Sequence, residues 1–147
     1  MTHAKTAACA CLAILIALYV VGAVSVPPGS LRHEVQTLPL WFAIVAGFRN
    51  RDIAKWAALP CFVFWLGIMI LIWLYLLGIA RIVSGHFFPT EIVMTIVVGI
   101  ACVVGLLTSA RWKTTTSSAT AGGLVVLIAI LQVLAFRISL IPYIASR

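Results

Sequence analysis

The sequence predicts an all-α integral membrane protein that forms a single domain over residues 1–147. The chain is 64% hydrophobic and only 9% charged, whereas soluble globular domains average about a quarter charged residues. The apolar residues lie in continuous runs of about 20, the length at which an α-helix crosses roughly 30 Å of hydrocarbon. These runs do not alternate as the strands of a membrane β-barrel do, and the segments between them are too short for a soluble domain.

Four apolar runs predict transmembrane helices at about 7–26, 57–80, 92–110 and 121–141. A fifth segment, at about 38–48, has only eleven residues and would cover half a crossing as a helix. Pro39 favours the first turn of a helix, Gly47 its end, and Trp41 the membrane interface. We expect a short interfacial or re-entrant helix here, and a full crossing stays open as the alternative.

Basic residues predict the orientation, because loops rich in Lys and Arg tend to stay in the cytoplasm. The basic residues divide six to four between the two faces whether or not segment 38–48 crosses, since a crossing makes Lys5 and Arg32 exchange faces. Both topologies place loops 49–55 and 111–120 in the cytoplasm, and loop 81–91 and the C-terminus outside. We expect a bacterial cytoplasmic (inner) membrane protein, with the hydroxyl-rich loop 111–120 serving as a flexible tether.

The first run also resembles a signal peptide. MTHAK supplies a positive charge, an apolar run follows, and Ala23, Val24 and Ser25 resemble a cleavage site. The run is longer than is usual for a signal. An uncleaved first transmembrane helix and a removed signal peptide therefore both stay open.

Small residues recur every four positions in two of the predicted helices and give each a narrow, smooth face. Such faces permit close contact between helices in lipid. We expect packing within the monomer, with a dimer contact or a docking face for another membrane subunit as the alternative. The cysteines form no C-x-x-C pair and are expected to be buried packing residues. The two faces consist of Cys9, Ala13 and Ala17 in the first helix and Ala101, Gly105 and Ser109 in the third.

Gln132 is the only amide inside a predicted span, on the same face of the last helix as Ala135 and Ser139. A buried amide in hydrocarbon needs a partner, which a neighbouring helix usually supplies at a gain of roughly 1 kcal/mol. We expect Gln132 to join two helices rather than to line a transport path.

Polar residues are also expected to meet at the outer face. Glu91 either begins a helix, with Thr90 as N-cap, or pairs with Arg137 or Arg81. If segment 38–48 crosses, His33 reaches the same face, as does Glu34, but we expect no metal site there. The predicted outer polar cluster consists of Arg81, His86, Glu91 and Arg137.

Catalytic and nucleotide-binding motifs are absent from the sequence. It contains no G-x-G-x-x-G, G-x-x-x-x-G-K-[ST], G-x-S-x-G or H-E-x-x-H, so we expect no catalytic residue and no cofactor. No carboxylate lies in the centre of a predicted span, where a proton-coupled carrier would need one. The net charge of +7 favours contact with anionic lipid headgroups and not with nucleic acid, because no folded basic domain is predicted.

Three functions are compatible with these patterns. The first hypothesis is a non-catalytic accessory, assembly or scaffold subunit that packs through its small-residue helix faces. The alternatives are a small oligomeric transporter or channel, and a membrane enzyme that acts on lipid or quinone at the outer interface. The expected partners are the lipid bilayer and either another membrane subunit or further copies of the chain.

Overall fold

The computed structural model describes residues 2–25, 31–80, 82 and 87–141. This part of the chain contains no strand. It forms five α-helices: α1 (His3–Ser25), α2 (Leu31–Phe48), α3 (Ile53–Leu76), α4 (Pro89–Arg111) and α5 (Ser118–Ser139). Four of them, namely α1, α3, α4 and α5, are long and apolar enough to cross a membrane. The predicted class, an all-helical membrane protein with four candidate spans and one further helix, is confirmed.

The helix α3 ends earlier than its apolar run predicts. The run continues to Ala80, but the helix stops at Leu76. Gly78 has a φ of +73°, a left-handed conformation that glycine adopts without steric cost. The N–H groups of Leu77, Gly78 and Ile79 donate back to carbonyls of the last turn. These backbone hydrogen bonds end the helix.

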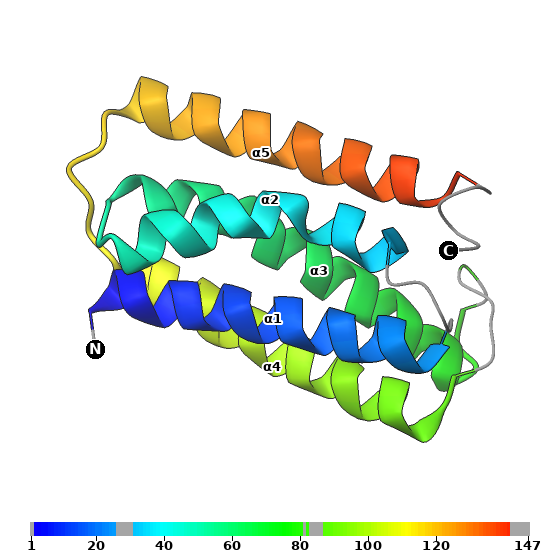
Figure 1. Ribbon diagram of the computed structural model, residues 1–147. Coiled ribbons are helices and arrows are strands. Elements are labelled where there is room, and N and C mark those ends of the chain that lie inside the picture. Colours follow the sequence, from blue (N-terminus) through cyan, green and yellow to red (C-terminus); the bar gives the residue numbers. More distant parts are fainter. Residues whose placement is uncertain (1, 26–30, 81, 83–86, 142–147) are drawn as a thin grey trace.

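The fifth helix, α2, is longer than the predicted segment and has 18 residues, or about 27 Å at 1.5 Å per residue. It lies along the bundle beside α1, α3 and α5 and not across its end (Figure 1). Its apolar half buries Leu40, Ala43 and Ile44 in the core. Its polar half, from Arg32 to Thr37, buries Gln36 and Thr37. The same face thus carries both polar and apolar residues inside the bundle.

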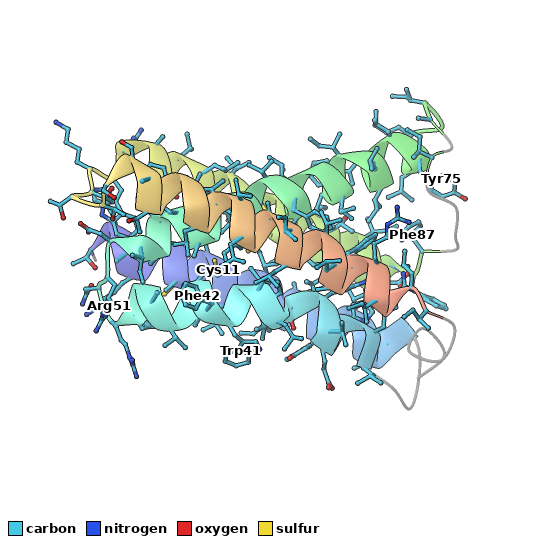
Figure 2. All side chains as sticks on the ribbon, turned by 90° about the horizontal axis from the view of Figure 1, so that it is seen from above. Cys11, Trp41, Phe42, Arg51, Tyr75 and Phe87 are labelled. Carbon is cyan, nitrogen blue, oxygen red and sulfur yellow. The ribbon has the colours of Figure 1, made fainter. Side chains whose placement is uncertain are left out.

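Successive helices run in opposite directions (Figure 1). The N-terminus lies at the same end of the bundle as the α2–α3 and α4–α5 connections, which we call the basic end. The opposite end, which we call the Glu91 end, carries the α3–α4 connection and the end of α5. Figure 2 shows Arg51 at the basic end and Tyr75 and Phe87 at the other. The basic residues gathered at the basic end are Lys5, Arg49, Arg51, Lys55, Arg111 and Lys113.

The helices form three layers: α5 covers α2 and α3, which in turn cover α1 and α4 (Figure 1). Among the described residues, α5 packs against α2 and α3 only. The core contains residues of all five helices, most of them from α1 and α3, and Cys11, Cys61 and Cys102 are fully buried in it. The Cys61 thiol donates to the carbonyl of Ala57 within its own helix. Cys9, by contrast, is exposed, so the expected burial holds for three of the four cysteines.

Candidate functional site

A chain of buried hydrogen bonds joins α2 to α5 towards the Glu91 end. Gln132 Nε2 donates to the backbone carbonyl of Gln36 at 3.0 Å, and Gln36 Nε2 donates to Ser139 Oγ at 2.9 Å. Ser139 Oγ donates in turn to the carbonyl of Phe136 at 2.6 Å. Gln132 and Ser139 are 0% exposed and Gln36 is 3% exposed. The structure thus places Gln132 between two helices, bonded to a neighbour.

Gln36 was not expected in this contact, because it precedes the apolar segment and resembles a loop residue. The burial of Gln36 could have been predicted from helical geometry, since Gln36 and Thr37 fall on one helical face with Leu40 and Ala43. The Oε1 atom of Gln132 is buried without a hydrogen-bond partner. A buried unsatisfied carbonyl costs about 1–3 kcal/mol in water-soluble proteins.

His33 of α2 lies against α1 at the Glu91 end. Its Nδ1 atom is buried without a hydrogen-bond partner and would be 2.9 Å from a Cβ atom added at Gly22, so only glycine leaves room for the ring. The imidazole lies close enough to Arg32 and to Glu91 to interact electrostatically with both. His33 and Glu91 therefore lie at the same end, as a crossing α2 requires.

Glu91 begins α4, although in a different register from the predicted one. The N-cap is Phe88 and not Thr90, with Pro89 in the first helical position. The Glu91 carboxylate is 8% exposed, and its Oε2 accepts a hydrogen bond from the Phe88 N–H at 2.8 Å. The side chain thus satisfies one of the free donors at the helix start, where a negative charge is also favoured by the helix dipole.

The predicted outer polar cluster is only partly within the described residues. Arg81 and His86 lie outside them. Arg137 is exposed on α5 and is not placed in an ion pair with Glu91. The reason is helical geometry: Arg137 follows Gln132 by five residues, which turns it about 140° away from the buried face of α5. The structure therefore brings His33 towards Glu91, and directs Arg137 away from the bundle.

The small-residue face of α4 packs inside the monomer. Ala101, Gly105 and Ser109 are buried, and a Cβ atom at Gly105 would overlap the ring of Phe62 from α3. The face of α1 is divided, because Ala17 is buried, Ala13 is half-buried and Cys9 is exposed. The face of α4 is thus covered by the chain itself, and the face of α1 is exposed at Cys9.

At the basic end, the loop before α5 is held against the start of α3. Asp52 Oδ2 accepts hydrogen bonds from the backbone N–H and the hydroxyl of Thr115, both at 2.9 Å. These bonds lower the pKa of the Asp52 carboxyl. Lys55 Nζ donates to the carbonyl of Trp112 at 2.6 Å. Loop 111–120, expected to be a flexible tether, is therefore fixed to the bundle by polar contacts that its composition does not reveal.

An apolar groove of about 420 Å³ runs between α2 and α5. It is open on the side that faces away from the core, and its α5 wall extends from Leu124 to Ile138. All of the lining residues are apolar. The α2 wall consists of Val35, Leu38, Pro39 and Phe42.

Metal and family assignments receive no support from the described part of the chain. Among those residues, no three His, Cys, Asp or Glu side chains are grouped so that they could hold a metal ion. The sequence and structure match no protein-family model, no curated protein and no solved structure. The features with functional content are thus the α2–α5 contacts, the groove beside them and the exposed helix faces.

Proposed function

We propose that the protein is a non-catalytic accessory or assembly subunit that binds a second membrane-embedded chain through the outer face of α5. This face is defined by exposed residues. Apart from the adjacent pair Gly122 and Gly123, they recur every three or four positions, a spacing typical of a helix–helix seam. Within the part of the chain that the structure describes, α5 packs against two helices and so has room for a further one. The outer face consists of Ala119, Gly122, Gly123, Val126, Ile130, Val133 and Arg137.

Two glycines on this face carry the proposal. A Cβ atom added at Gly122 or Gly123 would have no atom within 4 Å, so nothing in the chain itself requires glycine at either position. Gly105, by comparison, is required by Phe62. Glycine inside a helix costs about 1 kcal/mol relative to alanine. Small residues in a membrane helix allow a second helix to approach closely, and this accounts for the two glycines.

The interior of the bundle argues against the transporter hypothesis. A transport path needs a polar, accessible interior, but Gln132 is 0% exposed and its Nε2 is bonded to the carbonyl of Gln36. The surrounding core consists of closely packed apolar residues. Function at the surface of the bundle fits this packing better than conduction through it.

The position of α2 supports a five-crossing topology with the basic end in the cytoplasm. α2 is antiparallel to α1 and lies along the bundle (Figure 1), which brings Lys5 to the same end as Arg49 and Arg111. Its length of about 27 Å is close to the hydrocarbon thickness of roughly 30 Å. The basic end carries more Lys and Arg residues than the Glu91 end, as the cytoplasmic side of membrane proteins does. The N-terminus would then be cytoplasmic and the C-terminus external.

A bulky substitution on the outer face tests the proposal. Gly123→Leu should abolish the complex without unfolding the chain, because the site has room for the side chain. Gly67→Leu on α3 is the matched control. A Cβ atom at Gly67 also meets nothing within 4 Å, but large side chains three and four positions away, such as Ile70 and Val63, prevent a second helix from approaching closely there. A photo-crosslinker at Ile130, with one at Val63 of α3 as the control, locates the contact.

The tagged chain is expressed in its native membrane, extracted in mild detergent and analysed by native mass spectrometry. The wild type and Gly67→Leu should form one complex of defined stoichiometry, and Gly123→Leu should leave only the 15.9 kDa chain. A wild type that stays monomeric, or crosslinks that form equally at Ile130 and Val63, would contradict the proposal. Solute uptake by liposomes that contain the purified chain alone would favour the transporter.

A further inference from the structure

Arg32 of α2 lies about one helical turn beyond the end of the groove between α2 and α5. It precedes Val35 by three residues and Pro39 by seven, and it is not itself a lining residue. It is partly buried, and its Nε atom is buried without a hydrogen-bond partner. A guanidinium near hydrocarbon is expected to be paired. The described residues place no carboxylate in an ion pair with Arg32.

The dimensions of the groove limit what can occupy it. The α5 wall from Leu124 to Ile138 spans 14 residue steps, or about 21 Å. The α2 wall, from Val35 to Phe42, spans seven steps, or about 10 Å. A volume of about 420 Å³ between these walls is large enough for an extended hydrocarbon chain.

The length and position of the groove suit a lipid. One leaflet contributes about 15 Å of hydrocarbon, half of the roughly 30 Å core, and the groove is slightly longer. The lining is entirely apolar, as an acyl chain requires. Arg32 lies at the Glu91 end, near the level of lipid headgroups if α2 crosses the membrane. A guanidinium binds a phosphate through two parallel N–H donors.

We propose that the groove holds one acyl chain of a phospholipid whose phosphate binds Arg32. The lipid belongs to the leaflet at the Glu91 end, and the chain passes between Val35 and Pro39 on one side and Leu131 on the other. The phosphate supplies an anionic partner for the Arg32 guanidinium. This lipid site lies on a different face of α5 from the outer face, and it does not depend on the proposed protein partner.

The test measures lipid retention by native mass spectrometry of the purified full chain. The probes are phosphatidylglycerol and diacylglycerol with identical acyl chains, added separately after delipidation. Arg32→Gln removes the phosphate ligand, and Arg137→Gln removes one positive charge from the exposed side of α5 as its control. Leu131→Trp fills the groove, and Ile130→Trp places the same bulk on the outer face. Thermal unfolding in detergent confirms that each variant is folded.

The wild type should retain one phosphatidylglycerol, and Arg32→Gln and Leu131→Trp should each weaken retention at least tenfold. The two control variants should bind as the wild type does. Diacylglycerol should bind the wild type at least tenfold more weakly, a comparison that does not depend on any variant folding. Equal retention by the wild type and Arg32→Gln, equal binding of the two lipids, or a groove occupied by a second copy of the chain would overturn the proposal.

Discussion

Replacing Gly105 by alanine is expected to destabilise the protein, whereas the same change at Gly123 is expected to stabilise it. A Cβ atom at Gly105 overlaps the Phe62 ring from α3, and one at Gly123 meets nothing within 4 Å. Phe62 is fully buried, so its ring cannot move away freely. Both substitutions make the same chemical change inside a membrane helix. The difference between the two stability changes therefore measures the contribution of packing.

The magnitudes follow from overpacking and helix propensity. Extra methyl groups in a packed core cost about 1–3 kcal/mol, and removing a glycine from an unconstrained helix position gains up to about 1 kcal/mol. In a protein of roughly this length, 1 kcal/mol shifts the melting temperature by about 2–4 °C. Gly105→Ala should thus lower the melting temperature by about 2–12 °C, and Gly123→Ala should raise it by up to about 4 °C.

Thermal unfolding of the purified chain in one detergent checks both values. Phe62→Leu should reduce the cost of Gly105→Ala, with a coupling of about 0.5–3 kcal/mol in the double-mutant cycle. If Gly105→Ala is as stable as Gly123→Ala, or if the cycle shows no coupling, then the contact between α3 and α4 is not the one described.

Two further outcomes are expected from the polar contacts. Gln132→Met should change stability by less than about 1 kcal/mol, because the lost hydrogen bond is offset by removing a buried carbonyl without a partner; a loss above about 2 kcal/mol in detergent unfolding would show that Oε1 is bonded. Asp52→Asn should weaken the hold on Thr115 and increase amide hydrogen exchange in loop 111–120, with global stability little changed since Asp52 is a surface group.

The four spans could be predicted because their signal is local. A continuous apolar run of about 20 residues has few alternatives in a membrane protein. The end of α3 was missed because the conformation of Gly78 is set by turn geometry, which hydropathy does not record. The position of Arg137 was predictable in principle, since its angle from Gln132 follows from the helical repeat alone.

The true extent of α2 could not be read from its own residues. Its first half is polar, and burial of Gln36 is possible only because Ser139 and Gln132 lie opposite it on α5. These partners are far away in the sequence, and no local pattern connects them. The position of His33 could not be predicted from local sequence either, because its place against α1 depends on the absence of a side chain at Gly22.

The separation of Gln36 and Ser139 also has a consequence for how the chain enters its membrane. The two residues are 103 positions apart, and a ribosome that adds about 5–20 residues per second needs about 5–20 s to make the second after the first. During that interval α2 has no partner for its buried amide in lipid. α2 is therefore expected to remain near the membrane surface until α5 has been synthesised, and to take its place in the bundle last. A chain truncated before α5 should leave α2 accessible to aqueous reagents.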